Sequence, residues 1–555
     1  MFRRIFLVGT AIFLLAWSKS HAADIAEASQ FISELGCAAC HTTLSQKPVT
    51  KERAPDLSTA GLRYNPAWLF EFLQRPVKVR RHIGHSRMPG FHLSDEESLA
   101  LVEFLTTQTN IPGAWPELPS VARSSNNPTP QEFQSALASG LLCLNCHTLD
   151  GKGGALGVEL GDVSFRLRRD WVKEYLVFPE RLGVAPGLMP PQFYAITNGH
   201  FQSIVPDASH KIQVVADYLF SRNASRRQDL QDRFDRAKQS ATNAAAETGR
   251  RLFTALNCAG CHRHSSINPK VANAAPDLTQ ESKRVKRTWL ESYLQHPFAI
   301  RPLGFQPGDG SRMPDFRLTQ QEVATVVGSI SAAPPRVSAP PRALSAFAIR
   351  KATLLLTDKL SCLGCHRLGE RGGRIGPDFN GVRDRLQPDY VLSVIQNPRE
   401  TNPHSIMPRV PMTDDTRRLI GDFLVQQPQP PSREKYVSLV GNVPTIYDAN
   451  APASPPNTYA RHCALCHGPT GNGDGLNARY LPVRPTAHAD SGYMSRRPDD
   501  TLFDGIHSGA GILNRSPYMP PWGETFSRTE IAGLVQYIRQ LCHCAGPEWS
   551  RDGTR

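Results

Sequence analysis

The chain has 555 residues, more than a single hydrophobic core usually serves, so several domains are expected. With 40% hydrophobic and 20% charged residues, it is excluded from the disordered and fibrous classes. A formal net charge of +13 would suit a nucleic-acid or membrane-surface protein, but the basic residues are not interleaved with aromatic ones as in nucleic-acid-binding segments.

The first 22 residues have the features of a targeting segment. Arg3 and Arg4 precede an apolar run from Ile5 to Trp17, and Ser20-His21-Ala22 provides a cleavage site. The run is short for a membrane span, and no later stretch of that length lacks charges. We therefore expect a cleaved signal peptide and a chain that is periplasmic or otherwise exported, without a stable transmembrane span. An uncleaved N-terminal anchor is the alternative.

A Cys-x-x-Cys-His pattern then occurs five times. Two thiols one helical turn apart can both add to the vinyl groups of a haem, and the adjacent imidazole is then held under the iron, so each pattern predicts a covalent haem c site. A zinc site would need ligands in sets of four, which these isolated pairs do not supply. The predicted attachment residues are Cys37, Cys40, Cys143, Cys146, Cys258, Cys261, Cys362, Cys365, Cys463 and Cys466, and the predicted proximal ligands are His41, His147, His262, His366 and His467.

One Met-Pro dipeptide follows each pattern, 41 to 52 residues after its His. A thioether at the sixth position completes His/Met ligation and raises the reduction potential relative to bis-His iron. The proline stiffens the loop that carries this weak ligand. Five of the eight methionines match the five patterns one to one, so a role as iron ligands explains them better than packing in the hydrophobic core does. The predicted sixth ligands are Met88, Met189, Met313, Met407 and Met519.

Each of the five segments resembles a class I cytochrome c domain. The resemblance implies an all-α fold of five tandem cytochrome c-like helical domains, each wrapped around a covalent haem c, so that five haems are expected. Successive patterns begin 101 to 115 residues apart, which is the spacing of whole domains rather than of solenoid repeats. After the signal peptide at 1–22, the predicted domains span residues 23–109, 128–223, 240–331, 343–427 and 450–545.

The order of elements in the family is also visible in the sequence. Helix-like runs precede three of the patterns, and a second helix closed by a proline follows four of them. Capping boxes at Ser94, Thr319 and Ser527 are expected to begin three of the last helices. The helix-like runs cover 25–35, 131–142 and 249–256, and the second helices cover 68–73, 171–176, 289–294 and 390–394.

The family also implies a role for a proline after each pattern. Its carbonyl accepts a hydrogen bond from Nδ1 of the haem His, which fixes the orientation of the ring. Pro55, Pro276 and Pro377 are the matching positions in segments one, three and four, and segments two and five show no counterpart. The charged stretch from Arg222 to Thr248 is expected to form a solvated helix that leads into the third domain.

The mature protein with its haems is expected to be less basic than the formal net charge of +13 indicates, for two reasons. Loss of the leader removes three positive charges and no negative ones, leaving +10, and the propionates of five haems would offset most of that. Some arginines are expected to neutralise propionates, and others to steer an acidic redox partner. Nucleic acid is not an expected partner. Cys542 and Cys544 lie outside the five patterns and are expected to form a short-loop disulfide or to stay free.

These features predict a pentahaem c-type cytochrome that mediates electron transfer in an exported respiratory or redox chain, with no catalytic residues. One alternative is a haem enzyme resembling peroxidases or thiosulfate dehydrogenases, which needs an open sixth position. Another is a cytochrome subunit of a larger oxidase or dehydrogenase complex, including one docked at a membrane. The fifth segment favours the latter, because its glycines and its Tyr518-Met519-Pro520-Pro521-Trp522 loop differ from the other four.

Overall fold

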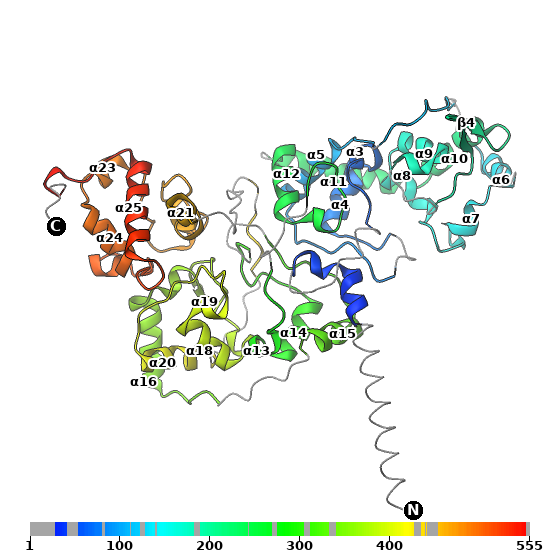
Figure 1. Cartoon of the computed structure of the whole chain (residues 1–555). Coiled ribbons are helices and arrows are strands. Elements are labelled where there is room, and N and C mark those ends of the chain that lie inside the picture. The colour runs from blue at the N-terminus through cyan, green and yellow to red at the C-terminus, as the bar shows by residue number, and fades with distance from the viewer. Residues whose placement is uncertain are drawn as a thin grey trace, which may run out of the picture.

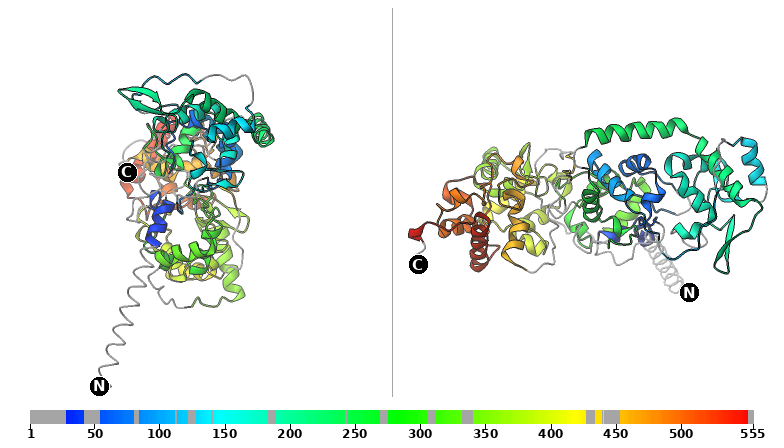
Figure 2. Two further views of the ribbon diagram at one scale, coloured as in Figure 1. Left: turned by 90° about the vertical axis from the view of Figure 1, so that its right-hand side faces the viewer. Right: turned by 90° about the horizontal axis from the view of Figure 1, so that it is seen from above.

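The computed structural model describes residues 28–41, 54–79, 84–111, 113–121, 128–138, 141–182, 189–241, 244–268, 275–304, 311–331, 340–426, 434–438, 440 and 453–550. The predicted signal peptide lies outside these ranges. The five predicted domains are called segments one to five below. Figures 1 and 2 show a mostly helical molecule drawn out along one direction, with segment two at one end and segment five at the other.

Segments one and three have the same order of elements. In each, a helix precedes the Cys-x-x-Cys-His pattern, a 3-10 turn carries the cysteines, and three helices follow. In segment one these are the helix over residues 28–35, η1 (Cys37–Ala39), α3 (Ala60–Arg63), α4 (Pro66–Gln74) and α5 (Asp95–Thr106). In segment three they are α12 (Ala246–Ala255), η4 (Cys258–Gly260), α13 (Glu281–Arg284), α14 (Arg287–Gln295) and α15 (Gln320–Ile330).

Segments two and four add short antiparallel hairpins that the all-α expectation did not include. Segment two contains α6 (Pro130–Ala138), α7 (Cys143–Cys146), β1 (Thr148–Leu149), β2 (Lys152–Gly153), η2 (Leu160–Asp162), α8 (Val163–Arg166), α9 (Arg169–Val177), η3 (Pro179–Leu182), β3 (Tyr194–Thr197), β4 (His200–Ser203) and α10 (Ala208–Ser221). Segment four contains α16 (Ala346–Leu354), the π-helical turn η5 (Leu355–Lys359), η6 (Ser361–Gly364), β5 (Arg367–Leu368), β6 (Arg371–Gly372), α17 (Val382–Arg385), α18 (Pro388–Gln396), α19 (Pro398–Thr401) and α20 (Asp414–Leu424).

Segment five is helical, and α25 is the longest of its described helices. Its elements are α21 (Pro455–His462), α22 (Ala464–His467), η7 (Ala478–Tyr480), α23 (Ser491–Met494), α24 (Asp499–Ser508), η8 (Ala510–Leu513), α25 (Arg528–Cys542) and η9 (Glu548–Ser550). A disulfide joins Cys542, the last residue of α25, to Cys544.

The helix predicted within Arg222 to Thr248 is α11 (Ala224–Ser240). It is charged and largely exposed, but Leu230, Phe234 and Ala237 are buried on its inner side. That side lies along α4, where Arg226 and Arg233 pair with Glu71. The helix therefore crosses back over segment one before the chain enters α12 (Figure 2).

The helices that precede the first and third patterns are exchanged. Phe31, Ile32 and Leu35 of the helix over residues 28–35 are buried in a cluster whose other members come from segment three, including Leu290, Leu294, Val323 and Val327. Conversely, α12 packs against α5 of segment one, where Phe253 meets Phe104 at 5.5 Å between ring centroids. We refer to residues 54–109 as body one and to residues 275–331 as body three.

Neighbouring bodies are joined by short backbone bridges. Segment two meets body one through Asn65 N to Arg166 O at 3.0 Å and Arg168 N to Arg63 O at 2.9 Å. The same arrangement joins body three to segment four, through Lys286 N to Arg385 O at 2.8 Å and Gln387 N to Arg284 O at 3.0 Å. A third bridge pairs Gly90 with Asp315 and joins body one to body three.

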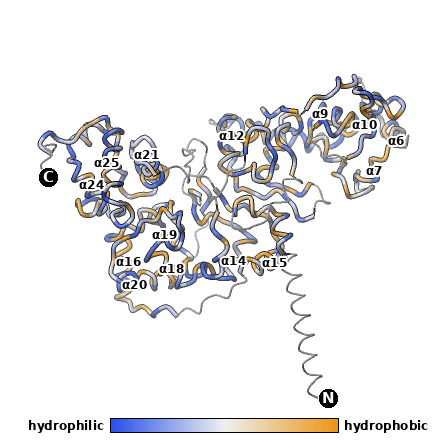
Figure 3. Tube along the Cα trace, in the orientation of Figure 1, coloured by the Kyte–Doolittle hydropathy of each residue, from blue (hydrophilic) through white to orange (hydrophobic). Residues whose placement is uncertain are grey.

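Hydrophobic residues are distributed along the trace in short stretches, as Figure 3 shows. Across the residues that the structure describes, no helix has both the length and the apolar character needed to cross a membrane.

Candidate functional site

Each of the five histidines in the Cys-x-x-Cys-His patterns is held by a backbone carbonyl. Because a carbonyl only accepts, Nδ1 must donate, which leaves the lone pair on Nε2 as the atom able to bind a metal. The five pairs of Nδ1 and carbonyl oxygen are His41 with Pro276 at 3.0 Å, His147 with Val158 at 2.8 Å, His262 with Pro55 at 3.1 Å, His366 with Pro377 at 2.7 Å and His467 with Thr486 at 2.8 Å.

These partners differ from the predicted ones in two ways. Pro55 and Pro276 do contact a haem-site His, but each serves the pattern of the other segment. Segments two and five use Val158 and Thr486, which the sequence reasoning missed. No sequence signal marks them, because every residue offers the same backbone carbonyl, whatever its side chain.

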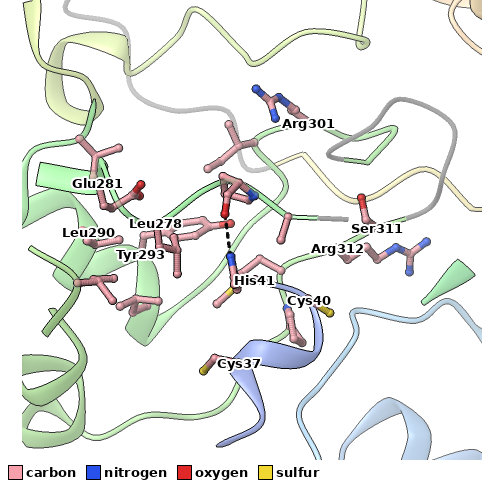
Figure 4. Close-up of a pocket in the computed structure, with 18 of the residues that line it drawn as sticks. Cys37, Cys40, His41, Leu278, Glu281, Leu290, Tyr293, Arg301, Ser311 and Arg312 are labelled. Carbon is pink, nitrogen blue, oxygen red and sulfur yellow. Dashed lines mark hydrogen bonds between the residues drawn. The ribbon is translucent and has the colours of Figure 1, made fainter. Parts of the chain in front are cut away.

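The first pattern lies in a cavity of about 230 Å³ built mostly by segment three. Cys37, Cys40 and His41 form one part of its wall, and Met313 forms another. Figure 4 shows the helical turn of Cys37 and Cys40 facing side chains from segment three, with the bond from His41 drawn as a dashed line. Met88, which follows this pattern in sequence, does not line this cavity.

The third pattern lies in the reciprocal cavity, of about 210 Å³, built mostly by segment one. Cys258, Cys261 and His262 line it together with Met88, while the apolar walls include Trp68, Leu101 and Phe253. Val158 of segment two also lines this cavity.

The fourth pattern and its own Met-Pro share one cavity, of about 180 Å³. Cys362, Cys365, His366 and Met407 all line it. His404 and Met412 line it as well, so the cavity offers two further side chains that could reach a metal.

In segments two and five the predicted groups adjoin common apolar clusters. Cys143 and Met189 both pack against the large cluster formed by segments one and two together with α11 and α12, and Cys463 and Met519 both pack against the core of segment five. His467 is stacked on His488 with ring centroids 4.1 Å apart, and Tyr459 Oη lies 3.0 Å from His488 Nδ1.

Burial favours the neutral form of four of the predicted His ligands. It lowers the pKa of His41, His262 and His467, and it lowers the pKa of His366 to about 4. A neutral imidazole is the form that binds a metal. Burial also raises the pKa of the Cys37, Cys258 and Cys463 thiols to about 12, so the free sulfurs are protonated at neutral pH.

Buried arginines make the cavities suited to an apolar group that carries carboxylates. Arg385 lines both the first and the fourth cavity, and burial, together with the nearby charge of Arg301, lowers its pKa to about 10. Arg63 also lines the third cavity; this residue is half-buried, its guanidinium lies over the rings of Tyr64 and Trp171, and its Nε has no hydrogen-bond partner. A buried guanidinium is costly without an anion, and the propionates of haem would provide one. The residues present therefore fit haem c.

Comparisons with protein families support the same class of site. The model for the cytochrome c family matches residues 25–109 and 246–329, and the model for cbb3-type cytochrome c oxidase subunit III matches residues 450–538. The chain therefore contains several cytochrome c family domains, whose implied cofactor is covalent haem c and whose implied partners are redox proteins. Neither the curated proteins nor the solved structures yield a match.

Proposed function

We propose that this protein is an exported pentahaem c-type cytochrome whose function is electron transfer. The observation that supports it best is the repetition of one arrangement: five cysteine pairs, each followed by a His whose Nδ1 donates to a carbonyl. Three of these groups share a cavity with one of the predicted Met residues. Export to a periplasm is part of the proposal, on the evidence of the sequence of residues 1–22.

The chain's own residues hold, insulate and balance the cofactor. Haem c supplies the one-electron chemistry when it is bound. The cysteines are the attachment points, the histidines and methionines are the proposed ligands, and the apolar walls exclude water. Buried arginines, such as Arg385, would balance the propionates. A His and a Met that both bind the iron would suit electron transfer rather than binding of a small substrate.

The fourth site offers a test with an internal control. Met407→Ala should reduce the Met-to-iron charge-transfer absorption of the ferric protein by about a fifth, because one of five thioether ligands is lost. Met412→Ala should leave the band unchanged, although Met412 lines the same cavity. Mass spectrometry of both variants should still show five covalent haems.

Two results would contradict the proposal. Fewer than five haems in fully matured protein would remove the five-site assignment. A band that is insensitive to Met407→Ala while His404→Ala changes the spectrum would make His404 the ligand and the fourth haem a low-potential bis-His centre.

A second candidate function is a cytochrome subunit of a larger oxidase complex. The match of residues 450–538 to the cbb3-type subunit III family favours it. A free carrier should exchange electrons with acidic partners at a rate that falls as salt is raised, whereas a permanent subunit should co-purify with its complex in high salt. Rapid carbon monoxide binding at one haem would instead favour a haem enzyme.

A further inference from the structure

We infer that the first and third haem sites are exchanged between segments: the haem on Cys37 and Cys40 takes Met313 as its sixth ligand, and the haem on Cys258 and Cys261 takes Met88. This inference rests on the proposed function, since it needs both haems to be bound. It replaces the pairing by sequence order, in which each pattern would use the next Met-Pro along the chain.

The first pattern is embedded in body three. Its His41 donates to Pro276 O, and Met313 is the Met-Pro methionine that lines its cavity. The helix before it contributes Phe31 and Ile32 to the core of that body, where both are about 5% exposed. The group that orients the His, the proposed sixth ligand and the core behind the pattern all come from segment three.

The third pattern is embedded in body one by equivalent contacts. His262 donates to Pro55 O, and Met88 lines its cavity. Leu57 N donates to Arg263 O at 3.0 Å, directly after the pattern. In α12, Gly249 lies so close to α5 that a Cβ atom would stand 1.8 Å from Ala100 O. This close contact between two backbones shows that α12 packs against body one.

The α11 helix explains why α12 reaches body one. Its 17 residues span about 25 Å and pack against α8 of segment two and against α4 and α5 of segment one. Ion pairs hold it there, including Arg233 Nη1 with Glu71 Oε2 at 3.3 Å and Lys238 Nζ with Glu103 Oε1 at 2.9 Å. The chain therefore enters α12 beside α5.

The two exchanged sites also share a wall. Asn257, next to the third pattern, donates from Nδ2 to Ala39 O at 2.8 Å within the first pattern. Gly36, Cys40, Leu256, Asn257, Pro314 and Phe316 line both cavities. The loops that carry Met88 and Met313 are bridged by two hydrogen bonds of 2.8 Å between Gly90 and Asp315. Bodies one and three thus form one unit with two adjacent sites.

Combined substitutions in the full-length holoprotein distinguish the two pairings. Cys37→Ala with Cys40→Ala removes the first haem and leaves four Met-ligated sites. In this background, Met313→Ala should not reduce the charge-transfer band further, because its haem is already absent. Met88→Ala should remove about a quarter of the remaining band, because it serves the third haem. Any further loss on adding Met313→Ala overturns the exchange.

The reciprocal background provides the matched control. With Cys258→Ala and Cys261→Ala, Met88→Ala should be silent and Met313→Ala should reduce the band. In the Cys37→Ala, Cys40→Ala protein, the band of four Met-ligated haems could instead be unchanged by Met88→Ala and reduced by Met313→Ala. The exchange is then wrong, and the proposed function stands. If no Met-to-iron band is present in the parent protein, the proposed function fails instead.

A second measurement leaves all five haems in place. A photoreactive phenylalanine analogue at position 31 should cross-link to residues 285–330, since Phe31 is buried among them. The same analogue at position 253 should cross-link to α5, where Phe104 is the neighbour. His85 is also an expected neighbour, since its ring centroid lies 4.9 Å from that of Phe31. Cross-links from position 31 to α4 or α5 overturn the exchange.

Discussion

Glu97 and Arg312 form an ion pair that is buried between body one and body three. Both side chains are about 1% exposed, and Arg312 Nη1 lies 3.0 Å from Glu97 Oε2. Glu97 also closes the capping box of α5 with Ser94. Arg312 is the residue before Met313. The pair therefore connects the start of α5, the last helix of body one, to the loop of body three that carries the proposed ligand Met313.

Removing one partner of this pair should destabilise the protein strongly. Glu97→Gln keeps a residue suited to the capping box but leaves Arg312 uncompensated, so we expect a loss of about 3–5 kcal/mol in the unfolding free energy of the exchanged unit. Glu291→Gln, which breaks the exposed pair of Arg287 and Glu291, should cost less than about 1 kcal/mol. Urea titration followed through the Met-to-iron band measures both. Equal losses in the two variants would contradict this account.

The hydrogen bonds of His41 and His262 to backbone carbonyls could be predicted from the sequence only in part. Residues 54–57 and 275–278 have the same sequence, Ala-Pro-Asp-Leu. The sequence therefore indicates that Pro55 and Pro276 orient haem-site histidines, but it holds no local signal for which histidine each one receives. That choice depends on contacts made more than 200 residues away in sequence.

Among the elements, α12 packs closely against α5, and Gly249 faces the backbone of Ala100 there. Gly249→Ala should therefore destabilise the unit by about 1–3 kcal/mol, because the added methyl group meets the backbone of Ala100. Gly328→Ala in α15 is the control, since no atom lies within 4 Å of a Cβ atom there. It should be neutral or stabilise by about 0.5–1 kcal/mol through helix propensity. Thermal unfolding of both variants tests the difference, and a neutral Gly249→Ala would contradict it.

The sequence predicted most helices and their starts, because both depend on local chemistry. The second helices are found as α4, α9, α14 and α18, and the capping boxes at Ser94, Thr319 and Ser527 are confirmed. The hairpins were missed although two have a local signal: Asp150-Gly151 between β1 and β2 and Asn198-Gly199 between β3 and β4 have positive φ, as tight two-residue turns require. The predicted helix of α11 was correct, but its packing on α4 depends on a distant segment.

At the scale of the whole molecule, the contacts place the five sites in the order two, three, one, four, five. Val158 holds the second His and lines the cavity of the third pattern, and Asn257 joins the third pattern to the first. Pro377 lines the first cavity and holds the fourth His. Asn477 of segment five donates to Gly364 O of the fourth pattern at 2.9 Å. Each step connects adjacent sites through a shared residue or a direct hydrogen bond.

This order predicts which haems influence each other's reduction potentials. Charges interact more strongly at short range, so loss of one haem should shift the potentials of its spatial neighbours. Cys37→Ala with Cys40→Ala should shift two of the remaining midpoints, those of the third and fourth haems. Cys463→Ala with Cys466→Ala should shift only the fourth. Spectroelectrochemical titration measures this, and a single shifted midpoint in the first variant would favour the order along the sequence.

The exchange also determines when parts of the molecule can fold during synthesis. The bonds from His41 to Pro276 and from His262 to Pro55 span 235 and 207 residues, and contacts of such separation form late. The first haem pattern emerges long before body three exists, and body one must wait for α12. Segment two, whose His147 bonds a carbonyl only 11 residues away, can fold earlier. A chain that ends before residue 246 therefore holds one finished domain, segment two, preceded by a first pattern that lacks body three and by a body one that lacks α12.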